Sequence, residues 1–176
     1  MARYLIVYAT REGQTEKIAF RIAEQIGRAG GDVVVHNAAD PVAAPLHCDV
    51  LIYGASIHYG SVEPELIRFM QAHHDAIDPR RFHLFVVLMS AATRDPLRRH
   101  NALAEVEQKV RASLPVHFGH IEMMAGAIMY SKYRWPIRWV MRRIARQEGG
   151  GEDTRRDYEY TDWEQVESYA ASLMAP

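Results

Sequence analysis

The sequence predicts a doubly wound α/β domain in which helices cover both faces of a five-stranded parallel sheet. Two observations indicate this fold class. Apolar runs of strand length recur along the chain, mostly without polar alternation, as expected of parallel strands that are buried on both faces. Stretches of helical period separate these runs. A chain of 176 residues has the size of one domain, so we expect a single domain over residues 1–176.

The expected strands cover residues 4–9, 33–36, 50–54, 84–89 and 121–127. The helix after the first strand places Ile18, Ile22 and Ile26 on one face, which we expect to pack on the sheet. Further helices fit at about 64–74 and 101–113. The pattern Thr-Asp-Trp-Glu from Thr161 is that of a capping box, and it predicts the start of the last helix.

The connection before this last helix is unusually long. About thirty residues separate Ala127 from Thr161, whereas such connections in compact α/β units take only a few residues. We therefore predict an insertion at about 128–156. In this interpretation the last strand is interrupted after Ala127 and resumes near residues 157–160.

The insertion contains a predicted basic amphipathic helix within residues 132–147. Its apolar residues fall on one face and are Ile137, Val140, Met141 and Ile144. Its other faces carry the arginines Arg138, Arg142, Arg143 and Arg146. Such a helix is typical of a segment that lies on an anionic membrane surface or binds an acidic partner. The alternative is a helix that packs its apolar face on the domain.

Composition limits the class of protein. The formal net charge of -1 gives no reason to expect nucleic acid as a partner. A single cysteine, Cys48, cannot form an internal disulfide and suits the cytosol. The N-terminal apolar run is too short for a signal peptide or a membrane span, so we expect a cytoplasmic protein. His117 and His120 have a spacing of three, but no carboxylate or third ligand is evident beside them, so we expect no metal site.

The turn after the first strand, "ATREGQTEKIA", has the parts of a phosphate-binding loop. Hydroxyls at Thr10 and Thr15, the cation Arg11, and Gly13 precede a helix whose N-terminus favours anions. The turn lacks both the three glycines of a dinucleotide motif and the Gly-Lys-Ser/Thr of a triphosphate loop. An ordinary strand-to-helix turn is the alternative, because such turns are rich in Gly and Thr.

Two further loops follow strands at the same expected sheet edge. The segment "GASIHYGSVEPEL" offers an apolar and aromatic wall at Ile57, His58 and Tyr59. The small residues of "SAATRDPLRRHN" permit close approach of the backbone to a ligand. Because the carboxyl ends of parallel strands meet at one edge, we expect these loops to form one site, which suits an aromatic ring system.

The segments "TREGQT", "GASIHYG" and "YSKYRWPIRW...GGGEDTRRDYEYTDWEQV" resemble those of the flavodoxin-type, quinone-dependent (menaquinone-dependent) protoporphyrinogen IX oxidases of bacteria. The similarity runs over nearly the whole chain, and the last segment is the most specific. The resemblance implies a flavodoxin-like fold and FMN as cofactor. The implied phosphate-binding residues are Thr10, Arg11, Glu12, Gly13, Gln14 and Thr15. The implied residues beside the isoalloxazine are Ser56, Ile57, His58, Tyr59, Gly60, Ser90, Ala91 and Ala92.

The resemblance further implies oxidation of protoporphyrinogen IX to protoporphyrin IX in haem biosynthesis, with electrons passed to a membrane quinone. His58 is a candidate proton acceptor, although a lone histidine is more often structural. An aromatic wall for the flavin could come from Tyr59 or from Tyr130, Tyr133 or Trp135. The alternative function is that of an electron-transfer protein or an FMN-dependent quinone reductase.

The basic helix suits peripheral attachment to the inner face of the cell membrane, because arginines pair with lipid phosphates or with substrate carboxylates. Substrate contact is expected from Tyr133, Arg134 and Trp135, beside the helix arginines already named. The sequence leaves open whether the protein forms a homo-oligomer.

Overall fold

The central sheet has the predicted parallel arrangement. The computed structural model describes residues 2–41, 48–58, 60–73, 82–147, 151 and 153–175. Five parallel strands run in the order β2-β1-β3-β5-β6, which confirms the doubly wound class. Their bounds are Arg3–Ala9 for β1, Asp32–Asn37 for β2, Val50–His58 for β3, Phe82–Leu88 for β5 and Ile121–Ala125 for β6.

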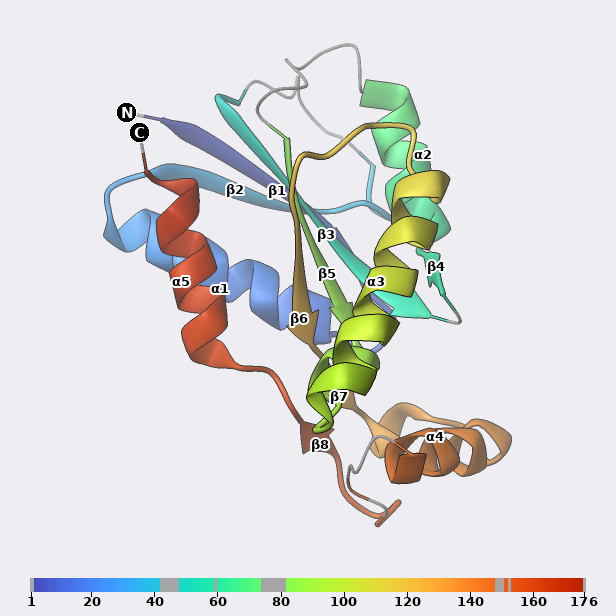
Figure 1. The fold of residues 1–176 in the computed structure, drawn as a ribbon. Coiled ribbons are helices and arrows are strands. Elements are labelled where there is room, and N and C mark those ends of the chain that lie inside the picture. The colour runs from blue at the N-terminus through green and yellow to red at the C-terminus, as the bar shows by residue number, and fades with distance from the viewer. Residues whose placement is uncertain are drawn as a thin grey trace.

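Helices cover both faces of this sheet (Figure 1). α1 (Gln14–Arg28) and α5 (Trp163–Leu173) lie side by side on one face, where Arg21 donates to Glu167 across the pair. α2 (Pro64–His73) and α3 (Pro96–Ser113) cover the other face. The predicted inward face of α1 is confirmed, since its three isoleucines are fully buried.

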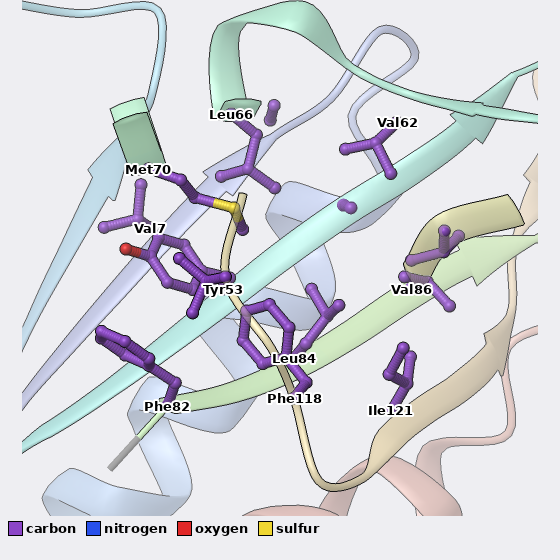
Figure 2. Close-up of a cluster of buried hydrophobic side chains, with 14 of the residues drawn as sticks. Val7, Tyr53, Val62, Leu66, Met70, Phe82, Leu84, Val86, Phe118 and Ile121 are labelled. Atoms are coloured by element: carbon purple, nitrogen blue, oxygen red, sulfur yellow. The ribbon is translucent and has the colours of Figure 1, made fainter. Parts of the chain in front are cut away.

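The core has one layer on each side of the sheet. Figure 2 shows the layer below α2 and α3, where Tyr53, Leu84 and Val86 of the sheet face Leu66 and Met70 of α2. Alternate residues of the same strands, such as Ile52 and Phe85, face α1 and α5 instead. Burial on both faces explains why the strands are continuously apolar in the sequence.

Several local predictions differ from the structure, among them the bounds of β5, which covers 82–88 rather than 84–89, and of β6, which ends at 125 rather than 127. β3 runs on to His58 and pairs antiparallel with the two-residue β4 (Ser61–Val62), because the chain reverses there. α3 begins at Pro96 rather than near residue 101, since Asp95 caps its N-terminus and Pro96 suits the first helical position. Asp162, not Thr161, is the N-cap of α5, and it accepts hydrogen bonds from the two backbone N–H groups that follow Trp163.

The insertion forms a small unit of its own. β6 gives way to β7 (Ala127–Ile128), which pairs antiparallel with β8 (Tyr158–Glu159). The strand predicted to resume near residues 157–160 therefore pairs with β7 and does not rejoin the main sheet. The 3-10 turn η4 (Tyr130–Lys132) and α4 (Trp135–Gln147) lie between β7 and β8. In Figure 1 this unit lies beyond the carboxyl ends of the sheet strands.

Contacts within the insertion hold it in place. Tyr130 is fully buried beside Ile128 and Ala145, and its hydroxyl donates to the carbonyl of Gly151. Asp157 accepts hydrogen bonds from the backbone N–H of Ser131 at 2.8 Å and from its hydroxyl at 2.6 Å. Among the residues that the structure describes, no helix has both the length and the apolar character needed to cross a bilayer.

Candidate functional site

A cavity of about 420 Å³ opens at the carboxyl ends of β1, β3 and β5. The chain segments that line it come from the loop after β1, the ends of β3 and β5, and the insertion. The lining residues are Thr10, Arg11, Glu12, Gln14, Thr15, Ser56, Ile57, His58, Val87, Leu88, Met89, Ala127, Lys132, Tyr133, Ile137 and Met141. The structure thus brings the first two predicted loops together with the insertion around one space.

The loop after β1 is shaped to receive an anion. Gly13 has a left-handed backbone with φ of 94°, and its N–H donates to the hydroxyl of Thr10 at 3.0 Å. Within the described part of the chain, no side chain caps the N-terminus of α1, so its first N–H groups are available to a ligand. The hydroxyl oxygen of Thr15 is buried without a hydrogen-bond partner among the described residues, although it lies in the cavity wall. A bound phosphate would satisfy it.

Glu63 was not predicted from the sequence as a site residue, and it contacts two residues that line the cavity, Arg11 and Ser56. Its side chain is 6% exposed, and its carboxylate lies 2.9 Å from Nε of Arg11. It also accepts a hydrogen bond from the hydroxyl of Ser56 at 3.2 Å. Arg11, predicted to bind phosphate, is therefore paired with a buried carboxylate. The available sequence signal was an acidic residue directly before Pro64, at the start of α2, where negative charge is favourable.

His58 lies between two carboxylates. Its Nε2 is 3.1 Å from Oε2 of Glu12 and 3.7 Å from Oε1 of Glu63. The first distance is short, but the two groups are not aligned as a hydrogen bond, and Nε2 has no well-oriented partner among the described residues. The imidazole is half-buried in the cavity wall. It is placed to exchange a proton with a ligand there.

The third predicted loop does not line the cavity with the residues that were predicted from the sequence. Val87 and Leu88 at the end of β5 line the cavity, together with Met89, which directly follows β5. The predicted residues Ser90, Ala91 and Ala92 form the turn η3 (Met89–Ala92) and are not among the residues that line the described cavity, because β5 brings its own last residues to the edge. Gly60 has a left-handed backbone ahead of β4 and also lies outside the described cavity wall. Tyr59 lies outside the described residues.

The insertion supplies the aromatic wall through one of the predicted residues. Tyr133 lines the cavity and is 9% exposed, and burial raises the pKa of its phenol, so the hydroxyl stays protonated. Tyr130 is buried in the insertion, and Trp135 is 83% exposed, so neither lines the cavity. Ile137 and Met141 of the predicted apolar face of α4 complete the wall.

The outer surface of α4 is basic and aromatic. Trp135 and Trp139 are exposed one helical turn apart, at 83% and 64%, among the exposed arginines Arg142, Arg143 and Arg146. Arg134 is also exposed, whereas Arg138 is half-buried and donates through Nε to the carbonyl of Tyr133.

The apolar face predicted to meet a membrane is thus divided. Ile137 and Met141 line the cavity, and Val140 is 38% exposed. The side chain of Ile144 lies outside the described set. The most exposed apolar groups of α4 are its tryptophans.

A larger open groove of about 730 Å³ lies beside α1, against Phe20 and Trp163. Its charged groups are already paired inside the protein, for example Lys17 with Glu159 and Arg21 with Glu167. Its described lining residues come from α1 and Trp163 and include none from the loops after β1, β3 or β5. The cavity at the strand ends, with its unpartnered hydroxyl, is therefore the candidate site.

Comparison with known proteins identifies the family of the domain. A family described as a flavodoxin domain matches residues 5–155. Over 172 residues the chain is 31% identical to the protoporphyrinogen IX dehydrogenase (quinone) of Escherichia coli, with 96% of this chain and 93% of that protein covered. A protein of the same name from Leishmania major is 27% identical, with 97% and 74% covered.

Solved flavodoxins share the fold. Oxidised flavodoxin 1 of Bacillus cereus superposes with a TM-score of 0.54 at 18% identity, covering 98% of this chain and 97% of its own. The flavodoxin of Streptococcus pneumoniae gives 0.53 at 19% identity, with the same coverage.

Proposed function

The chain belongs to the flavodoxin-domain family of quinone-dependent protoporphyrinogen IX dehydrogenases, and from this membership we propose that it binds FMN and oxidises protoporphyrinogen IX to protoporphyrin IX. Electrons would pass to a membrane quinone. The observation that carries the proposal is the cavity itself, which joins a phosphate-binding loop to an insertion that closes its far side.

The residues present fit FMN. The phosphate would lie at residues 10–15. It would accept hydrogen bonds from the first N–H groups of α1, which no described side chain caps, and from the hydroxyl of Thr15, which has no partner among the described residues. The ring would rest against the apolar walls of the cavity, which Ile57, Leu88 and Tyr133 help to form. Bound FMN would supply the hydride acceptor and the electron relay to the quinone.

The chain's own contribution to the chemistry is a proton acceptor and a closed cavity. Each oxidation step removes a proton as well as a hydride from the porphyrinogen. The imidazole of His58 would take that proton, because it lies in the cavity wall and its Nε2 has no well-oriented partner among the described residues. Tyr133 and Met141 of the insertion would limit the access of water to this step.

We further propose that the outer face of α4 attaches the protein to the inner surface of the cell membrane. Trp135 and Trp139 suit the interface between lipid and water, and Arg143 and Arg146 suit anionic headgroups. This placement supports access to a quinone dissolved in lipid, since α4 also lines the cavity through Ile137 and Met141.

The first experiment is flavin uptake followed by turnover. Purified protein should take up FMN and show its absorption spectrum. The loaded protein, kept without oxygen, should convert protoporphyrinogen IX to fluorescent protoporphyrin when a quinone is added. A protein that binds FMN but is reduced only by another protein would be an electron carrier instead. Failure to bind FMN would reject both functions.

A further inference from the structure

Lys132 reaches from the insertion back to the loop after β1. It is the last residue of η4, and its Nζ donates to the backbone carbonyl of Glu12. Nζ also lies 3.3 Å from the position that a Cβ atom would take on Gly13. A side chain that is 120 residues away in the sequence therefore lies against the turn that opens α1.

Lys132 differs from the other cations near this turn. Arg11 is paired with Glu63 at 2.9 Å, and Lys17 is paired with Glu159 at 3.0 Å. Among the described residues, the hydrogen-bond partner of Lys132 is a neutral carbonyl oxygen, and its charge also helps to lower the pKa of Asp157 without a direct ion pair. An ammonium group has three donors, so this contact leaves donors for an anion.

The position of Lys132 is set by its neighbours. Ser131 is held by two hydrogen bonds to Asp157, and the buried side chains of Tyr130 and Tyr133 flank the segment. Because the backbone beside Lys132 is already fixed, this cation loses less conformational freedom on binding an anion than a cation on a flexible segment would lose. The buried, unpartnered hydroxyl of Thr15 lies in the same cavity wall and independently points to an anionic ligand.

We propose that Lys132 is a ligand of the FMN phosphate that the insertion supplies to the loop of the flavodoxin domain. This inference rests on the proposed binding of FMN. The ammonium would form a charge-assisted contact with a phosphate monoester bound at residues 10–15. Because binding linkage is reciprocal, the phosphate would also hold the insertion against the domain.

The test compares two flavins on two variants. The apoprotein is titrated with FMN and with riboflavin, which lacks the phosphate, and flavin fluorescence gives each Kd. Lys132→Met should raise the Kd for FMN about 10-fold or more and leave the Kd for riboflavin unchanged. Lys132→Arg should retain most of the FMN affinity. The matched control is Arg155→Met, which removes one exposed positive charge from the same insertion and should change neither Kd.

The outcomes separate this inference from the proposed function. An unchanged Kd for FMN in Lys132→Met would overturn the role of Lys132 while flavin binding stands. An equal loss of both flavins would show that Lys132 only supports the cavity wall. A wild-type protein that binds neither flavin would reject the proposed function itself. Lys132→Gln provides the same comparison if the methionine variant does not fold.

Discussion

The Nε2 of His58 lies 3.1 Å from Oε2 of Glu12, so the end of β3 contacts the loop after β1 through a histidine and a carboxylate. Glu12 is an unexpected residue in the loop that we propose to bind phosphate, because its charge would repel the ligand. In the structure its carboxylate lies beside the imidazole on the wall of the cavity. The place of His58 in that wall is the basis for assigning proton transfer to it.

Replacing His58 tests that assignment. His58→Gln should lower the rate of protoporphyrinogen oxidation roughly 100-fold or more, as expected for loss of a general base. The Kd for FMN should stay within about 2-fold, because the loop after β1 is intact. His120→Gln is the control, since His120 is exposed and pairs with Glu122. A parallel loss of FMN affinity would show that His58 only shapes the site.

Thr15→Val should act in opposite directions on the apoprotein and on the complex. The buried hydroxyl has no partner among the described residues, and such a group costs about 1–3 kcal/mol. Urea denaturation of the variant without flavin should therefore give equal or higher stability. The Kd for FMN should rise about 10-fold, because the phosphate loses a donor. A less stable apoprotein with unchanged FMN affinity would contradict this role.

Glu63→Gln should destabilise the fold. It leaves the guanidinium of Arg11 without the carboxylate that lies 2.9 Å away. Since Arg11 remains half exposed to solvent, we expect a loss of about 1–2 kcal/mol rather than the larger cost of a fully buried pair. Urea denaturation measures this loss of stability. Glu65→Gln, which disrupts an exposed pair with Arg68 on the same helix, should cost much less.

Asp157→Asn should loosen the insertion. The hydroxyl and backbone N–H of Ser131 donate to this carboxylate and hold its pKa below the ordinary range. A depressed pKa in the folded state means that the stabilisation is present above the pKa of an unfolded aspartate, about 3.9. It is lost as the pH falls through the folded value.

Trypsin measures this effect at neutral pH, because α4 is rich in arginine. Asp157→Asn should be cleaved in α4 about 2- to 5-fold faster than the wild type. Asp153→Asn should be cleaved at the wild-type rate, because the carboxylate of Asp153 pairs with the exposed Arg155. Amide hydrogen exchange, corrected for intrinsic rates, should show the wild-type insertion loosening only at acid pH. Equal cleavage of the wild type and Asp157→Asn would remove Asp157 as the anchor.

Membrane attachment should depend on two kinds of side chain in α4. Replacing Arg143 and Arg146 by serine should weaken binding to anionic vesicles about 10- to 30-fold and reduce its dependence on salt. Replacing Trp135 and Trp139 should weaken binding without changing that dependence. Sedimentation with vesicles at several salt concentrations measures both effects.

The choice of arginines matters in this experiment. Arg138 and Arg142 are left in place because both interact within the protein. The control replaces Arg68 and Arg98, which are exposed on α2 and α3. If the control weakens vesicle binding as much as the α4 variants do, attachment depends on net charge rather than on α4.

Short-range patterns in the sequence were sufficient to predict the α/β architecture. Apolar runs of strand length and a helical period around Ile18 and Ile22 predicted the sheet and its first helix. The errors lie at boundaries, as at α3, where the Asp95-Pro96 pair was the available signal for an earlier start.

The candidate site was predicted in part. The position of Gly13 ahead of a helix predicted the phosphate loop, because the glycine and the helix start are neighbours in the chain. Met89 rather than Ser90 lines the cavity, since the length of β5 decides which residue reaches the edge of the sheet.

The sequence by itself determined the class of fold and the place of the insertion, because each depends on residues close together in the chain. Only the tertiary structure decided that Glu63 neutralises Arg11, that Lys132 reaches Glu12, and that the tryptophans of α4 face solvent. These contacts depend on strand register and on the reversal of the chain between β7 and β8. No local period encodes either of them.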